Sequence, residues 1–158
     1  MNSIFPRRSH QWWLGLVGFF LLWLAASPVV AQHIYQGGST YNTTLYTWDG
    51  RYLYQGSSKY GTKLLTWDGK HVYEGGSVYH DKLLTWDGRY IYQGGSTYNT
   101  KLATWDGLYL HQGGSTYNAT LCTIDGKHVY QGRSKYGEKL LTFDTPIPIP
   151  VLYIVLQL

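Results

Sequence analysis

The sequence predicts an all-β repeat protein in which six tandem 19-residue β-hairpin units close into a toroid of two-stranded blades. The first observation is a fixed period, since tyrosines recur every 19 residues and a histidine fills one position. These are Tyr35, Tyr54, Tyr73, Tyr92, His111 and Tyr130. The second is an Asp-Gly pair between two apolar runs in each unit, which is typical of a short hairpin. A short fixed period indicates units that bury apolar surface against their neighbours.

Five Asp-Gly turns are expected, and both residues of each turn are assigned a structural role. They are Asp49 and Gly50, Asp68 and Gly69, Asp87 and Gly88, Asp106 and Gly107, and Asp125 and Gly126. A type I′ turn needs positive φ at both central residues, which Gly adopts freely and Asp tolerates. With Asp and Gly at the centre, Trp67 pairs with Lys70 and Leu65 with Val72.

Both faces of each hairpin are largely apolar. Because side chains alternate along a strand, Trp67, Leu65 and Val72 share one face, and Leu64 and Tyr73 share the other. A sheet solvated on one side would show one polar face. Each hairpin is therefore expected to pack on both sides, which favours a ring over a flat meander.

The two ends of the repeat array suggest how the ring closes. Residues 33–37 have no upstream partner, and residues 139–143 have no downstream partner. We expect these two runs to pair with each other. An open hairpin array or solenoid is the alternative.

Residues 1–31 have the pattern of a secretory signal peptide. Arg7 and Arg8 precede an apolar core at 12–26, and small residues lead to Ala31, where cleavage is expected. The alternative is an uncleaved membrane anchor, which would be the chain's only membrane contact. Either reading places the repeats outside the cytoplasm, so we expect an exported protein (periplasmic, cell-surface or secreted).

Charge and cysteine content argue against a nucleic-acid partner and against a disulfide within the chain. Without Arg7 and Arg8 the 13 basic residues fall to 11, and 9 acidic residues leave a net charge of +2. The lysines are scattered, so no nucleic-acid partner is expected. Cys122 is the single cysteine, which excludes a disulfide within the chain. Its equivalents include Leu65 and Leu84, which indicates a small buried hydrophobe.

The chain is predicted to have three parts: the signal at 1–31, the repeats at 32–145 and a tail at 146–158. Alternating prolines in the tail at 146–150 cannot donate to a ladder, so this stretch is expected to be extended and outside the sheet. Residues 151–158 are apolar but too short to span a bilayer. An edge strand, a strap across the ring and a partner-binding tail stay open for them.

No motif for catalysis is present. The sequence has no Gly-x-Ser-x-Gly elbow, no phosphate-binding glycine loop and no paired carboxylates outside the turns. His33, His71 and His128 occupy a position where other copies have tyrosine, which indicates a half-exposed packing surface. We expect no enzyme activity, cofactor or metal site.

Two aromatic rows are the candidate ligand-binding residues. Trp48, Trp67, Trp86 and Trp105 flank the turns, and Tyr60, Tyr79 and Tyr98 represent a loop row at the other end. Sugar rings stack on such side chains, and several weak sites together gain avidity. The competing explanation is packing, in which three of the tryptophans contact Arg51, Lys70 and Arg89.

The repeat resembles those of known bacterial families. Ile-Tyr-Gln-Gly-Gly-Ser-Thr-Tyr at 34–41 and Leu-Tyr-Thr-Trp-Asp-Gly at 45–50 resemble the Val-Tyr-x-Gly-Ser-Ser-Thr-Tyr…Leu-Tyr-Thr-x-Asp-Gly repeats of uncharacterised bacterial exported proteins. The resemblance spans 34–145 and implies an envelope protein without an assigned activity. Residues 123–130 are more weakly similar to the hairpins of cell-wall-binding (choline-binding and toxin) repeats, although the doubled Tyr-Tyr-Phe of those repeats is missing. That likeness implies ligands held between successive hairpins.

The expected function is therefore a non-catalytic binding or interaction scaffold at the bacterial envelope. The expected partner is a glycan or another cell-envelope polymer, or else a protein. The alternative is a structural matrix or fibre-forming protein, because the composition is rich in Gln, Gly, Ser, Asn and Tyr.

Overall fold

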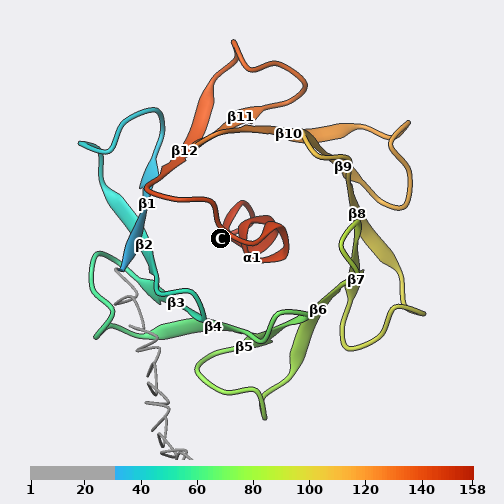
Figure 1. Ribbon diagram of the computed structural model, residues 1–158, viewed down its shortest axis with the longest axis horizontal. Coiled ribbons are helices and arrows are strands. Elements are labelled where there is room, and N and C mark those ends of the chain that lie inside the picture. Colours follow the sequence, from blue (N-terminus) through green and yellow to red (C-terminus); the bar gives the residue numbers. More distant parts are fainter. Residues whose placement is uncertain (1–30) are drawn as a thin grey trace, which may run out of the picture.

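The computed structural model describes residues 31–158 as a ring of twelve antiparallel strands around one helix (Figure 1). The strands are β1 (Gln32–Gln36), β2 (Thr44–Trp48), β3 (Tyr52–Gln55), β4 (Lys63–Trp67), β5 (His71–Glu74), β6 (Lys82–Trp86), β7 (Tyr90–Gln93), β8 (Lys101–Trp105), β9 (Tyr109–Gln112), β10 (Thr120–Asp125), β11 (His128–Gln131) and β12 (Lys139–Phe143). Each strand pairs with its neighbours in sequence, and β1 pairs with β12, so the sheet closes. The predicted all-β toroid of six hairpin repeats is confirmed.

The ring closes where the sequence predicts. Ile34 lies opposite Phe143 and Gln36 opposite Leu141 in the antiparallel ladder between β1 and β12. At the end of this ladder the Asp144 carboxylate accepts a hydrogen bond of 2.9 Å from the backbone amide of His33. The alternative of an open array is therefore wrong.

The predicted hairpin register is wrong by two residues. Trp67 pairs with Val72, not with Lys70. Asp68 is instead the last residue before the turn, and its amide donates to the His71 carbonyl oxygen at 3.2 Å. The positive-φ residues described are all glycines, so the aspartate does not take the left-handed conformation that a type I′ turn requires. A shift of two residues leaves the paired side chains of this ladder, from Leu65 to Trp67 and from Val72 to Glu74, on their predicted faces.

The other connections form six outward loops, which we call petals, at 37–43, 56–62, 75–81, 94–100, 113–119 and 132–138 (Figure 1). Each pair of strands that a petal connects contains one β-bulge close to that petal. Between β3 and β4, for example, Leu53 pairs with Leu65 and Tyr54 with Lys63, so Leu64 is the extra residue. Such a bulge bends the strand and turns its side chain, and Leu64 packs against the core of the ring.

Both faces of the strands are buried, as their apolar character predicts. Each copy contributes one fully buried aliphatic residue to the core, namely Ile34, Leu53, Val72, Ile91, Leu110 and Val129. On the opposite face a buried threonine in each copy donates its hydroxyl to a petal glycine. Thr66 Oγ1, for example, bonds the Gly75 carbonyl oxygen at 2.7 Å. The petals thus cover the outer face and are tied to it.

The tail is not a strand. Residues Ile149–Val155 form helix α1, which lies inside the ring (Figure 1). Val151 and Leu152 are 0% and 1% exposed. Proline is compatible with the first turn of a helix, and a helix that is apolar on all sides is typical of a buried one. The expectation of extended structure is therefore wrong from Ile149 onward.

No helix within residues 31–158 is long and apolar enough to cross a membrane. The predicted signal peptide, apart from Ala31, lies outside the described residues.

Candidate functional site

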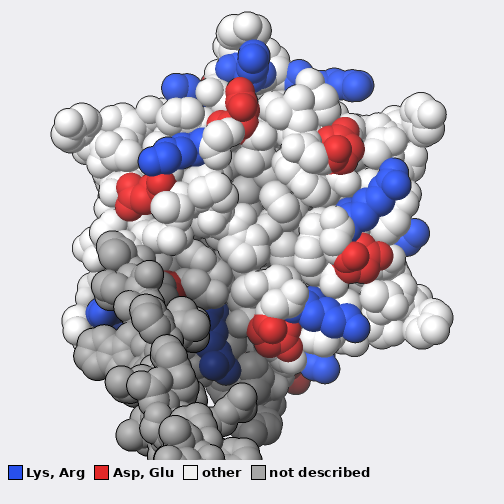
Figure 2. All heavy atoms as spheres, viewed as in Figure 1, with Lys and Arg blue, Asp and Glu red and all other residues white. Residues whose placement is uncertain are grey.

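The petals present one almost fully exposed tyrosine each. The exposed fractions are 98% for Tyr41, 88% for Tyr60, 95% for Tyr79, 98% for Tyr98, 98% for Tyr117 and 89% for Tyr136. We call these six residues the petal tyrosines. At such exposures they contribute almost nothing to the packing of the chain. Figure 2 shows several petal ends that carry no charged side chain.

Hydrogen bonds hold the petals in one conformation. In every copy a serine hydroxyl accepts a bond of 3.1 or 3.2 Å from the amide of the petal tyrosine two residues later, as between Ser77 and Tyr79. Where the petal has an asparagine, its side-chain amide reaches back six residues, as from Asn99 to the Gln93 carbonyl oxygen at 2.8 Å. The petal tyrosines therefore stand on ordered loops, which lowers the entropic cost of binding.

The tryptophan row is less accessible than the petal tyrosines. Trp48 is 3% exposed and belongs to the core. Trp67, Trp86 and Trp105 are half-buried. Trp67 borders a shallow depression of about 460 Å³ with Arg51 and Asp68, and Trp105 borders another of the same volume.

The expected contacts between tryptophans and basic side chains are not formed. The guanidinium of Arg51 lies 5.4 Å from the ring centroid of Tyr52, and that of Arg89 lies 5.5 Å from Tyr90. Among the described residues, every close approach of a cation to an aromatic ring involves a tyrosine. The register shift explains this difference, because it places Trp67 opposite Val72.

The turn aspartates are hydrogen-bond acceptors. Asp68 Oδ1 accepts from the amides of Lys70 and His71 at 2.8 and 2.6 Å, and Oδ2 accepts from the Tyr73 hydroxyl at 2.7 Å. Burial raises the pKa of Asp68, but these bonds outweigh it and hold the pKa well below its usual value. The bond to Asp68, with burial, raises the pKa of Tyr73 to about 12. Both groups therefore keep their protonation states at neutral pH.

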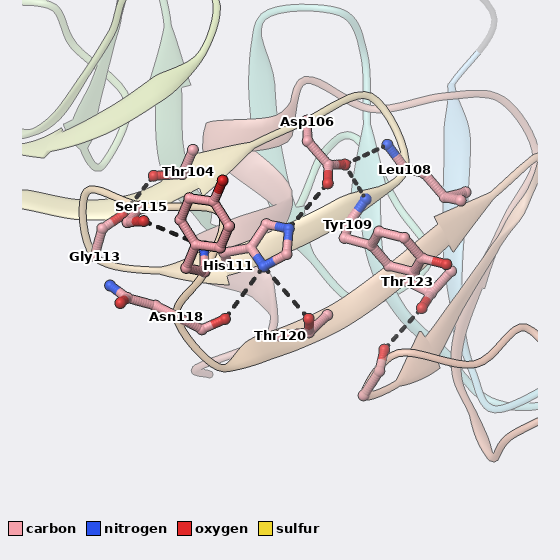
Figure 3. A network of polar contacts seen from close by, with 12 residues as sticks. Thr104, Asp106, Leu108, Tyr109, His111, Gly113, Ser115, Asn118, Thr120 and Thr123 are labelled. Atoms are coloured by element: carbon pink, nitrogen blue, oxygen red, sulfur yellow. Dashed lines mark hydrogen bonds and ion pairs between the residues drawn. The ribbon is translucent and has the colours of Figure 1, made fainter.

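At the fourth turn, a histidine replaces this tyrosine (Figure 3). His111 Nε2 lies 2.9 Å from Asp106 Oδ2, and Nδ1 lies 3.4 Å from both Thr120 Oγ1 and the Asn118 carbonyl oxygen. This His111–Asp106 pair was not predicted from the sequence, although the shared repeat position of His111 and Tyr73 carries the signal. His111 is buried, with 1% of its surface exposed. The pair substitutes for the Tyr–Asp hydrogen bond that Tyr54, Tyr73 and Tyr92 make in their copies.

The fifth turn differs. The Asp125 carboxylate accepts no hydrogen bond from the described residues, and β10 continues to pair Asp125 with His128. Gly126 has a φ of +60°, whereas Gly50, Gly69 and Gly88 have values of 94° to 99°.

No group of three His, Cys, Asp or Glu side chains within residues 31–158 could hold a metal ion. His33, His71 and His128, which share one repeat position, are half-buried and each packs against the tyrosine two residues later. Cys122 is buried, and burial raises the pKa of its thiol to about 12.

Comparison with known families agrees with this architecture. A family model described as "6-fold beta flower protein" matches residues 34–152, from β1 into α1. No curated protein and no solved structure matches the chain. The six petals around a closed ring are the feature that the description names. The chain belongs to the 6-fold beta flower protein family.

Proposed function

We propose that the protein is a non-catalytic exported scaffold that binds a repetitive partner at the bacterial envelope through its petal tyrosines. The observation that carries the proposal is the set of six tyrosines, 88% to 98% exposed, at one position of six ordered loops. A large apolar ring left in water on an ordered loop has no role in stability. It is suited to contact with a partner.

Multivalency determines the kind of partner. Six equivalent sites around one ring bind weakly one by one, but together they gain avidity for a polymer or a surface that offers many copies of one group. A glycan is the leading ligand class, because sugar rings present apolar faces that stack on tyrosine. The half-buried Trp67, Trp86 and Trp105 form a second, more recessed aromatic row that fits the same class.

The alternative of a fibre-forming protein has less support. All twelve described strands are paired on both sides, so the ring offers no free edge for cross-β assembly. The carboxylates of four turn aspartates, Asp49, Asp68, Asp87 and Asp106, are engaged in hydrogen bonds within the chain, which favours a binding role over catalysis.

The experiment measures binding of the full-length protein to peptidoglycan fragments and to a panel of soluble polysaccharides. Replacing Tyr79 and Tyr98 by serine should weaken binding by about tenfold or more, because avidity falls steeply when sites are lost. The same two residues replaced by phenylalanine are the matched control and should retain binding, since the ring face is kept. Both variants should melt at the wild-type temperature.

Two results would count against this proposal. Unchanged binding after all six petal tyrosines are replaced by serine would exclude them as the site. Absence of binding to every glycan would exclude the ligand class and leave a protein partner for the petal tyrosines.

A further inference from the structure

The space that the ring of strands encloses, which we call the lumen, holds α1. It contains a cavity of about 480 Å³ between α1 and the ring. Its wall on the ring side includes Leu102 of β8, Leu110 of β9, Cys122 of β10 and Leu140 of β12. Tyr153 and Leu156, in and just after the last turn of α1, form the opposite wall. The cavity therefore lies at the end of the lumen where α1 ends.

The cavity coincides with a departure from the repeat. The equivalent lumen position is occupied by Tyr46, Leu65, Leu84, Ala103, Cys122 and Leu141 in the six copies. The two smallest side chains, Ala103 and Cys122, are consecutive, and Cys122 lines the cavity. The main contact of α1 with the sheet is at β6, and beside Cys122 a cavity stays between the helix and the ring.

The chemistry of the wall is apolar with an uncharged polar edge. Gln112 and Gln157 contribute amides, and Gln157 Nε2 donates to the Tyr153 carbonyl oxygen at 3.0 Å, which leaves its own oxygen free to accept. Of the residues that line the cavity, Lys101 alone is charged. Its ammonium lies 3.9 Å from the ring centroid of Tyr90 and is engaged there.

We propose that this cavity is a binding site for a small uncharged apolar molecule that carries a hydroxyl or amide group at its outer end. Apolar side chains surround the body of such a ligand, and the glutamine amides bind its polar end. The volume is within the range of about 300–1,000 Å³ that is typical of small-molecule sites. The proposal does not depend on the petal tyrosines.

The test is binding of the uncharged fluorophore N-phenyl-1-naphthylamine to the full-length protein, with 1-decanol as competitor. Saturable binding that decanol displaces is expected. Cys122→Leu introduces the residue that three other copies carry, and should weaken dye binding by about tenfold or more because added methylenes occupy the site. Cys122→Ala keeps the space and should bind as the wild type does. Dye taken up elsewhere on the chain is equal in all three proteins and cancels.

A second measurement is independent of the variants. Cys122 is the chain's only cysteine, and its thiol is buried with a raised pKa, so its slow alkylation by excess iodoacetamide at alkaline pH, where the folded wild type is first shown to react measurably, reports on access to the cavity. Saturating decanol should slow alkylation of the wild type severalfold. If Cys122→Leu does not fold, this protection decides the question by itself. The proposal is overturned if decanol leaves the alkylation rate unchanged, or if a folded Cys122→Leu protein binds the dye like the wild type.

Discussion

The six copies of the repeat are alike in the petals but differ from one another at the position that faces the lumen. Every petal has the same serine and the same tyrosine, whereas the lumen position ranges from Tyr46 to Ala103. The petals face solvent, which is alike on all sides. The lumen faces a single helix, which cannot present the same surface to six copies. The comparison shows that a partner outside the ring meets six equal sites, while a molecule inside it meets only one.

The largest expected effect tests the lumen. Leu152 of α1 is 1% exposed, so Leu152→Ala should lower the free energy of unfolding by about 2–5 kcal/mol through lost burial and a residual cavity. Leu158 is 68% exposed, and Leu158→Ala should change the free energy of unfolding by less than about 0.5 kcal/mol. Denaturant titration measures both. Equal, small effects of the two substitutions would mean that α1 does not stabilise the ring. The contrast between the petals and a lumen shaped by α1 would then be wrong.

A smaller effect separates two copies of one repeated residue. The Asp68 carboxylate accepts hydrogen bonds from two backbone amides and from the Tyr73 hydroxyl, and it lies 3.2 Å from His71 Nδ1. Asp68→Ala should therefore lower the free energy of unfolding by about 1.5–3 kcal/mol. The Asp125 carboxylate accepts no hydrogen bond from the described residues, and Asp125→Ala should cost less than about 0.5 kcal/mol. Thermal melts with denaturant titration compare the two variants. Equal losses would contradict the role assigned to the carboxylate bonds.

The smallest expected effect is a pH dependence that comes from the outer turns and not from the lumen. The pKa values of Asp68, Asp87 and Asp106 are lowered in the folded protein, because hydrogen bonds to the carboxylates outweigh the effect of burial. Their contribution to stability is therefore complete above the unfolded value of about 3.9 and is lost as pH falls through the lower folded values. Unfolding free energies measured from pH 6 downward should decline below about pH 4. The decline should be shallower in Asp68→Ala, and identical slopes would contradict the assignment.

Periodicity and strand patterning were enough to predict the ring. The 19-residue spacing and the unpaired runs at 33–37 and 139–143 favour closure over an open array, and both faces of the strands are apolar enough to be buried. The hairpin register could not be predicted. It depends on whether Asp68 adopts positive φ or uses its carboxylate to bind the turn amides, and the second choice is the one observed.

The helix and the accessibility of the aromatic rows could not be predicted for a different reason. Proline at 150 suits both an extended chain and the first turn of a helix, and only the empty space inside the ring selects the helix. Likewise, identical tyrosines in every copy are compatible with packing or with exposure. The outward path of the petals, not the repeat, decides that Tyr79 is exposed.

The closure of the ring has a consequence for biosynthesis. The bond between His33 and Asp144 joins residues 111 positions apart, and α1 follows both. At about 5–20 residues per second, the first strand waits roughly 5–20 s for its partner to be made. During that time the growing sheet has an unpaired edge on each side, and unpaired edges can pair with other chains. Release of the complete chain before it folds would allow both edges to meet each other first.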